Sequence, residues 1–533
     1  MVRYDYIIVG GGTAGCVLAN RLSADPTTRV LMCEAGPPDN AWILHMPAGL
    51  RSVFKPSSRF NWWFETTPQP HLDGRTVAQP RGKTLGGSSS INGMTFLRGH
   101  PKDYDDWEAL GCRGWNYARC LPVFRDLEHC GHGDDRYRGR TGPVGVQRQE
   151  RLSPLNEAFL AAGAEAGFPA SDDPNGGDPE GFCRFDMSVF RGRRSSAARC
   201  YLHPIARRPN LAVVTGCLVH RVHLKGPRAV GVALQGPGGA VETVAAEREV
   251  ILCAGAFASP QLLMLSGIGP PDHLGRHGIA VRHPLPGVGQ NLQDHLEVHV
   301  QVETHRPVSL NRELQPHRML WAGLQWFVAK RGVAAVNQCH VGAFVKSEPG
   351  LARPDLQMHF FPLFFDAQWL PRPDVYGYRL GVGPVRPKSR GSVTLSSARV
   401  TDPPLIDPNY LALEEDRRAM VQGLNLAREI LAQPAFRPFH QREWLPGSDI
   451  RSKAALAGFI RAHAASAYHP CGTCAMGPDD DPEAVVDPQL RVRGLEGLRV
   501  VDASVMPRLV GANINPAVLM IAERGARAIL APG

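Results

Sequence analysis

Residues 6–15 read YIIVGGGTAG, an apolar run that enters a glycine-rich turn. The apolar residues predict a buried strand, the glycines predict a tight turn, and the residues after them predict a helix. In such a turn Gly10 permits the bend, Gly12 lets backbone amides approach a pyrophosphate, and Gly15 lets the helix lie close to the strand. A helix N-terminus also carries the partial positive charge that a diphosphate needs.

An acidic residue, Glu34, follows nineteen positions after Gly15, at the end of a second apolar run, residues 29–33 (RVLMC). At the end of a second strand this carboxylate can accept hydrogen bonds from a ribose diol. The strand, the turn, the helix and the acid together predict an ADP-type dinucleotide site in an α/β fold. The alternative is a glycine turn that serves packing alone.

The length and the composition indicate a soluble globular protein of two packed regions. A chain of 533 residues exceeds one ordinary core, and 43% hydrophobic with 20% charged residues is typical of soluble domains. No apolar run is long enough for a membrane span, and Arg3 and Asp5 beside the first strand argue against a signal peptide. The 12 cysteines lack framework spacing, so we expect a reducing, cytoplasmic compartment.

The net charge of +9 comes from scattered basic residues, with small clusters at 191–194 (RGRR) and 386–390 (RPKSR). Neither cluster is interleaved with aromatic residues, so we expect no nucleic-acid partner. Weak peripheral attachment to an anionic membrane surface, at the inner face of the membrane, stays open as an alternative.

Further strands and helices of the dinucleotide fold are predicted far from the N-terminus. Residues 249–252 and 498–502 predict buried strands, and a helix is expected from Ser259, with Pro260 in its first turn and Gly267 at its exit. Other predicted elements are strands at 211–214, 229–234 and 358–365 (MHFFPLFF) and a helix at 516–529. The dinucleotide fold is therefore assembled from separated pieces of the chain, whereas residues 297–460 lack dinucleotide signals.

Residues 466–477 (SAYHPCGTCAMG) form a second chemical landmark. Cys471 and Cys474 could form a redox dithiol, or hold zinc together with His469, although neither a thioredoxin-like context nor a fourth ligand is evident. Alternatively His469 is an acid/base residue, because an imidazole titrates near neutrality. A buried histidine with satisfied hydrogen bonds is the remaining interpretation.

These segments together resemble the glucose–methanol–choline (GMC) oxidoreductase family over nearly the whole chain. The resemblance rests on residues 10–15 with Glu34 and on the segments 81–93, 255–269, 469–477, 501–507 and 513–516. It implies FAD as the cofactor, a Rossmann-like FAD-binding domain built from discontinuous segments, and a substrate domain with an antiparallel sheet and helices. We expect the FAD-binding domain at 1–150, 200–296 and 461–533, and the substrate domain at 151–199 and 297–460.

The same resemblance implies the site residues. The FAD site would comprise Gly10, Gly12, Thr13, Ala14, Gly15, Glu34, Ala35, Arg81, Gly86, Gly87, Ser88, Asn92, Gly93, Met94, Thr95, Val219, Asp502 and Ala503. His469 would be the catalytic base, and Asn515 would be its partner, a position where other members carry histidine. An asparagine there can hydrogen-bond the substrate oxygen but cannot titrate. Some members bind FAD covalently through a histidine; Ile91 stands at that position, so non-covalent FAD is expected.

The implied reaction is oxidation of a primary alcohol to its aldehyde, with His469 removing the hydroxyl proton and a hydride passing to flavin N5. A quinone, a dye-like acceptor or oxygen would then take the electrons. The segments 45–47, 61–64, 98–100 and 405–410 resemble members acting on aliphatic alcohols, which favours an apolar alcohol. The alternatives are a choline dehydrogenase, for which no aromatic cage or carboxylate can be placed from sequence, an oxygen-using alcohol oxidase, and, in a different class, an FAD-containing hydroxynitrile lyase.

Overall fold

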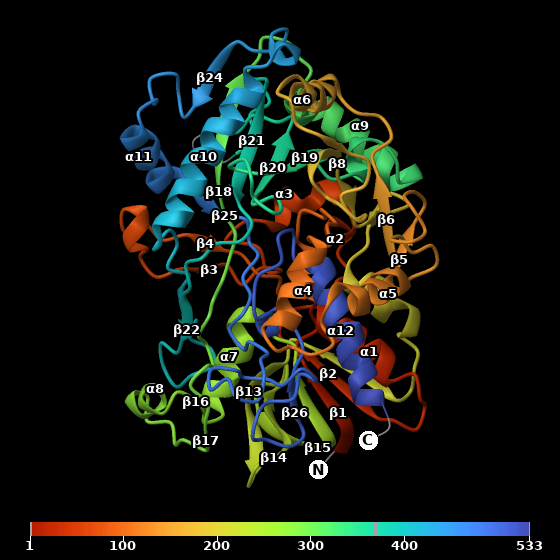
Figure 1. Ribbon diagram of the computed structural model, residues 1–533. Helices are drawn as coiled ribbons and strands as arrows, with labels where there is room; N and C mark the ends of the chain where they lie inside the picture. The colour runs from red at the N-terminus through yellow and green to blue at the C-terminus, as the bar shows by residue number, and fades with distance from the viewer. Residues whose placement is uncertain (1–2, 367–369, 532–533) are drawn as a thin grey trace.

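The computed structural model describes residues 3–366 and 370–531, and two β-sheets dominate it (Figure 1). In Figure 1 a mostly parallel sheet lies in the lower half of the molecule and a mostly antiparallel sheet in the upper half. The mixed α/β class expected from the sequence is confirmed. The division of the chain into domain segments at fixed residues stays a prediction.

The lower sheet has seven strands in the order β12-β2-β1-β15-β14-β13, and β26 pairs with β15. Its strands are β1 (Arg3–Val9), β2 (Val30–Glu34), β12 (Leu211–Thr215), β13 (Leu218–Lys225), β14 (Arg228–Gln235), β15 (Val241–Leu252) and β26 (Leu498–Val500). β1 lies between β2 and β15, so Ile7 is opposite both Leu31 and Val250 in parallel register. A strand buried on both faces reads as a continuous apolar run, which is why residues 6–9 were recognisable.

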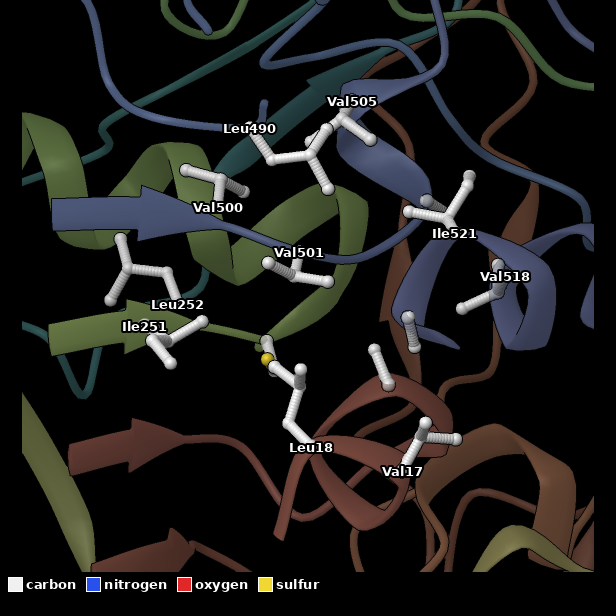
Figure 2. Close-up of a cluster of buried hydrophobic side chains, with 14 of the residues drawn as sticks. Val17, Leu18, Ile251, Leu252, Leu490, Val500, Val501, Val505, Val518 and Ile521 are labelled. Atoms are coloured by element: carbon white, nitrogen blue, oxygen red, sulfur yellow. The ribbon is translucent and has the colours of Figure 1, made fainter. Parts of the chain in front are cut away.

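Helices α1 (Thr13–Leu22) and α12 (Asn515–Leu530) pack together on this sheet. Figure 2 shows Val17 and Leu18 of α1 and Val518 and Ile521 of α12 in one cluster with side chains of β15 and the end of β26. Complete burial of each such side chain contributes about 1.5–3 kcal/mol. The two ends of the chain are therefore held in one core.

The upper sheet has eight strands in the order β24-β18-β21-β20-β19-β8-β7, and β25 pairs with β18. The strands are β7 (Ala170–Ser171), β8 (Gly181–Arg184), β18 (Leu296–Glu303), β19 (Val341–Val345), β20 (Leu356–Phe361), β21 (Gly377–Pro384), β24 (Arg442–Leu445) and β25 (Ala465–Ser466). Helices α6 (Pro154–Glu165), α10 (Glu414–Leu431) and α11 (Lys453–His463) share its hydrophobic core. Phe159 of α6 stacks on Phe360 of β20 with ring centroids 4.9 Å apart.

Two predicted elements differ clearly in their bounds from the structure. Helix α7 (Gly255–Leu265) begins before Pro260, so that proline lies inside the helix and not in its first turn. Gly267 follows the helix with a φ of 80°, as its predicted exit role requires. The strand predicted at 358–365 ends at Phe361 as β20, because Pro362 cannot donate to the ladder.

The remaining elements are short or peripheral. They are the helices α2 (Trp42–His45), α3 (Leu50–Val53), α4 (Pro101–Ala109), α5 (Tyr117–Leu127), α8 (Pro271–Arg276) and α9 (Pro316–Ala329), and the strands β3 (Phe64–Glu65), β4 (Ala78–Gln79), β5 (Glu128–Cys130), β6 (Val144–Arg148), β9 (Asp186–Met187), β10 (Val189–Phe190), β11 (Arg193–Arg194), β16 (Ile268–Gly269), β17 (His283–Pro284), β22 (Ser392–Thr394) and β23 (Leu405–Asp407). Within residues 3–366 and 370–531, no helix has the length and apolar character needed to cross a bilayer.

Candidate active site

One cavity of about 2340 Å³ runs from the strand ends of the lower sheet to the upper sheet. Most of the predicted site residues line it, namely Gly10, Gly12, Thr13, Ala14, Glu34, Ala35, Arg81, Gly87, Ser88, Asn92, Gly93, Met94, Thr95, Val219, His469, Asp502, Ala503 and Asn515. Gly15 and Gly86 lie behind this wall. The cavity exceeds the roughly 300–1,000 Å³ of a small-ligand pocket, so it has room for a dinucleotide and a substrate together.

The glycine turn has the close contacts that its sequence predicts. Gly10 has a φ of 106°, and a Cβ on Gly15 would lie 2.0 Å from the Gly10 carbonyl oxygen. A Cβ on Gly87 would lie 2.7 Å from the Cα of Gly12, so the second glycine segment packs directly on the first. Helix α1 starts after Gly12 without a side-chain cap, which leaves its first backbone amides available to an anion.

Glu34 closes this end of the cavity. Its Oε2 accepts a hydrogen bond from the Gly11 amide at 2.8 Å, and its Oε1 accepts one from the Gly36 amide at 2.7 Å. Burial raises the pKa of Glu34 to about 7, against its two backbone hydrogen bonds. The carboxylate thus fixes both turns and still faces the cavity, where a ribose diol would hydrogen-bond it.

The parts of the cavity wall that are formed by glycines leave room for FAD. A Cβ added to Gly93 or Gly255 would meet nothing within 4 Å, and one on Gly12 would meet nothing closer than 3.8 Å. These three glycines line the cavity and leave space where a flat or extended ligand would lie. Asp502 supports the same wall, since its Oδ2 accepts from the Gly255 amide at 2.9 Å and from Ser259 Oγ at 2.6 Å.

The second glycine segment links the two halves of the cavity. The Gly86 amide donates to the Gly11 carbonyl at 2.7 Å, which holds the segment on the dinucleotide turn. Arg81 Nη2 donates to the Tyr468 carbonyl at 2.8 Å, beside the histidine segment. Burial lowers the pKa of Arg81 to about 10, so the guanidinium is charged at neutral pH.

His469 lies in the middle of a hydrogen-bonded chain. Its Nδ1 is 2.9 Å from His295 Nδ1, and His295 Nε2 is 3.0 Å from the Val385 carbonyl. A carbonyl only accepts, so His295 carries its proton on Nε2 and accepts on Nδ1. His469 therefore carries its proton on Nδ1, and its Nε2 lone pair is the one that can act as a base.

Asn513 stands at that lone pair. Its Nδ2 is 3.1 Å from His469 Nε2, and its Oδ1 accepts from Gln357 Nε2 at 3.2 Å, which fixes the orientation of the amide. Burial and the neighbouring His295 hold the pKa of His469 well below its usual range. The ring is thus neutral at physiological pH and able to take a proton.

The predicted pairing of His469 with Asn515 is wrong in this structure. Asn515 opens α12, and its Oδ1 accepts from Thr13 Oγ1 at 2.8 Å, at the dinucleotide end of the cavity. Asn513, two residues earlier, faces the histidine instead. The segment 513–516 carries both asparagines, and the sequence offers no signal that separates them.

Asp294 positions the histidine segment. Its Oδ1 accepts from the His469 amide at 2.7 Å, and its Oδ2 accepts from Ser466 Oγ at 2.5 Å and from the Tyr410 hydroxyl. Asp294 and His295 were not identified as site residues from the sequence. They immediately precede strand β18, so a pair of polar residues at the start of a buried strand was the available signal.

Neither cysteine of the histidine segment takes part in the cavity. Cys471 and Cys474 are buried free thiols outside its lining, and burial raises the pKa of both. In the part of the chain that the structure describes, no group of three or more histidine, cysteine or acidic side chains is arranged to hold a metal ion. The geometry therefore favours the acid/base interpretation of His469 over the dithiol and the zinc site.

A buried carboxylate, Glu297, lines the upper part of the cavity and was also missed from the sequence. Its oxygens lie 3.3 Å from His299 Nε2 and 3.3 Å from His359 Nδ1. Despite burial, these two imidazoles hold the pKa of Glu297 well below its usual range, so it is ionised. Arg379 lines the same wall, and its charge acts on Glu297.

Three aromatic rings that contact one another line the same cavity. Phe54 lies edge-on to Trp63 at 5.9 Å and to Tyr468 at 5.1 Å between ring centroids. Burial and the charge of Glu297 raise the pKa of Tyr468, so its hydroxyl stays protonated. The charge of Glu297 thus acts both on Tyr468 and on the adjacent His469.

Known proteins similar to this chain cover nearly all of it. Sequence profiles of the family described as "GMC oxidoreductase" match residues 4–297 and 387–522. The mitochondrial choline dehydrogenase of Homo sapiens is 47% identical over 98% of this chain and 89% of its own length. The oxygen-dependent choline dehydrogenase of Brucella canis is 45% identical over 99% and 95%.

Solved structures agree with this likeness. A pyridoxine 4-oxidase from "Mesorbium loti" superposes with a TM-score of 0.89 at 34% identity, with 98% of each chain covered. A formate oxidase of Aspergillus oryzae, studied for its FAD modification, superposes with a TM-score of 0.93 at 27% identity and covers 99% of this chain and 98% of its own.

Proposed function

The chain belongs to the GMC oxidoreductase family, whose members are FAD-dependent enzymes acting on CH–OH donors, and we propose that it oxidises choline to the aldehyde. Choline is a primary alcohol that carries a quaternary ammonium group. This proposal departs from the apolar alcohol favoured by the sequence motifs, because the curated relatives are choline dehydrogenases.

The observation that carries the proposal is the placing of Glu297 and the aromatic rings in the cavity that contains His469. A quaternary ammonium group binds to aromatic faces and to carboxylates. Tyr468 precedes the base, and its ring contacts Phe54, so an ammonium group held there would keep the alcohol carbon within a short distance of His469.

The proposed chemistry separates a proton from two electrons. The substrate hydroxyl replaces Asn513 Nδ2 as the partner of His469 Nε2, which then accepts the hydroxyl proton. The Asn513 amide donates to the substrate oxygen as its negative charge grows. His295 keeps the proton of His469 on Nδ1, and Asp294 holds the histidine backbone. FAD, when bound, supplies the two-electron acceptor.

An uncharged primary alcohol is the second candidate. Arg379 lines the same wall as Glu297 and would oppose a second cation. The apolar side chains Leu310, Leu363 and Phe361 also line this part of the cavity and would suit an aliphatic substrate. The electron acceptor, whether oxygen or a quinone, stays a prediction.

The test is anaerobic bleaching of the holoenzyme. We expect choline to remove the oxidised-flavin absorbance, and its uncharged isostere 3,3-dimethyl-1-butanol to do so with much lower affinity. A stronger response to the isostere would replace choline by an uncharged alcohol. Cleavage of a cyanohydrin without bleaching would assign the protein to the lyase class instead.

A further inference from the structure

Helix α9 carries apolar side chains on its outer side. Leu320 and Val328 are 76% and 78% exposed. Trp42 of α2 joins them by packing edge-on against Phe327, with centroids 5.1 Å apart. We call this group the α9 face; all its members are at least half exposed, and they are Trp42, Met319, Leu320, Trp321, Leu324, Phe327 and Val328.

The inner side of the same helix is well anchored. Trp326 and Ala322 are buried in a small core with Met46, Ala334 and Ala335. The Trp326 indole N–H also donates to the Gly192 carbonyl at 2.7 Å. The helix therefore has apolar side chains on two sides, one buried and one at the surface. Single exposed apolar residues are ordinary on proteins, whereas a contiguous group of this kind marks an interaction surface.

Basic residues gather at the C-terminal end of this face. Lys330 and Arg331 follow the helix, and the hydrogen bond to Gly192 brings the turn between β10 and β11, with Arg191 and Arg193, to the same place. A Cβ on Gly192 would lie 1.9 Å from the Lys330 carbonyl oxygen, which shows how tightly the two segments pack. Arg191, Arg193 and Arg331 are exposed.

We propose that the α9 face docks on the surface of an anionic phospholipid bilayer. An exposed helix face with tryptophan and leucine, and with basic residues beside it, binds in the boundary between headgroups and acyl chains. Trp42 and Trp321 suit that boundary, because an indole is apolar with one polar N–H. The three exposed arginines would meet lipid phosphates, whereas Lys330 Nζ donates to the Trp326 and Phe327 carbonyls. The arginines give the surface a charge opposite to that of anionic lipid.

The docking face is continuous with the cavity. Trp42, Met319 and Phe327 line the cavity and are also about half exposed, so the cavity reaches the surface at α9. Docking would turn this opening towards the acyl chains. A lipid-soluble electron acceptor could then enter from the bilayer, a consequence that rests on the proposed function, whereas docking itself does not.

The test measures flotation of the holoenzyme with phosphatidylcholine vesicles, with and without added phosphatidylglycerol. We expect binding to the anionic vesicles and its weakening at high salt, because screening shortens the reach of the basic residues. The double variant Leu320→Glu/Val328→Glu should lower the partition coefficient by about tenfold or more. Neither residue lines the cavity, so flavin content and turnover of a soluble dye should be unchanged.

The matched control is Val241→Glu/Leu413→Glu, which adds the same two charges at exposed apolar residues outside the α9 face. It should bind vesicles as the wild type does. In the variant Arg193→Gln/Arg331→Gln, only the preference for anionic vesicles should fall. Equal flotation of the α9 double variant and the wild type would overturn the proposal. So would a lipid-free dimer that Leu320→Glu/Val328→Glu converts to a monomer, since a second copy would then cover the face.

Discussion

The lower and upper halves of the cavity bring their residues together in different ways. In the lower half, short continuous turns at the ends of β1 and β2 supply the wall, and glycines make it by leaving out side chains. In the upper half, polar side chains arrive singly from β18, β20 and the loops before α12. The lower half is therefore sensitive to added side-chain atoms, and the upper half is sensitive to the loss of a polar side chain.

The hydrogen bonds of the two halves show the same contrast. The lower turns satisfy their backbone amides locally, as the two bonds of Glu34 show. The upper half depends on a chain from Val385 through His295 and His469 to Asn513, in which each group fixes the next. A buried polar chain of this kind loses its function when one member is removed.

Removing the base of the upper half should have the largest effect. In His469→Ala we expect the rate of flavin reduction by the alcohol to fall by about 10²- to 10⁴-fold, because general-base assistance is lost. The variant should keep its yellow colour, since the residues proposed to hold FAD lie mostly in the other half. Anaerobic stopped-flow absorbance measures both. Near-normal reduction would remove His469 from its role.

Adding one methyl group to the lower half should give the next effect. In Gly15→Ala the Cβ would lie 2.0 Å from the Gly10 carbonyl oxygen, and overpacking costs about 1–3 kcal/mol of folding free energy. We expect a lower melting temperature and little bound flavin. Gly275→Ala in α8 is the matched control, because its Cβ meets nothing within 4 Å. Equal flavin content in both variants would contradict the contrast.

Substitution of each of the two asparagines should distinguish the roles of the two halves, although the asparagines are only two positions apart. Asn513→Ala should lower the rate of flavin reduction by about 10- to 100-fold, the worth of one hydrogen bond to a charged oxygen. Asn515→Ala should leave that rate largely unchanged and weaken FAD binding, because its partner is Thr13. Titration of the apoprotein with FAD and single-turnover kinetics distinguish them. The reverse pattern would restore the pairing expected from sequence.

Neutralising the carboxylate of the upper half should change selectivity more than rate. In Glu297→Gln we expect the dissociation constant for choline to rise by about tenfold, because a charge–charge attraction in a buried site is lost. The affinity for 3,3-dimethyl-1-butanol should change little. Anaerobic titrations with both alcohols make the comparison, and a parallel loss for both would mean that Glu297 does not face an ammonium group.

The pH dependence should show the smallest effect. Burial depresses the pKa of His469 below its ordinary value of 6.5, so the base stays unprotonated as the pH falls through that value. The acid limb of the flavin-reduction rate should therefore lie below pH 6.5. The free energy of unfolding should also fall as the pH drops from 6.5 to the lower pKa of the folded state, because in that range the unfolded state binds the proton more tightly. A limb above neutral pH would contradict this.

The sequence predicted the lower half better than the upper one for a physical reason. Glycine turns and buried strands are local, so residues 6–15 and 249–252 reveal β1, α1 and β15 without knowledge of the rest of the fold. The covalent-attachment position is equally local: Ile91 is buried and lines the cavity, and non-covalent FAD stays a prediction that release on denaturation would test.

The upper half depends on register, which one sequence does not give. Whether Asn513 or Asn515 faces His469 is set by where α12 begins against Thr13. Glu297 and His359 lie 62 positions apart and meet only because β18 and β20 flank β21. The strand that carries His359 was predicted from the sequence, but β18 was not, and neither Glu297 nor its pairing with His359 was identified.

The tripeptide from Asn513 to Asn515 spans both halves of the cavity. Asn515 at one end accepts a hydrogen bond from the Thr13 hydroxyl, where FAD would lie, and Asn513 at the other end contacts His469. A shift of α12 when the cofactor binds would therefore move the contact with His469. Such coupling between the binding of the cofactor and the binding of the substrate is reciprocal. We expect an ordered assembly in which the vacant apoprotein recognises the alcohol poorly and acquires that affinity with the nucleotide.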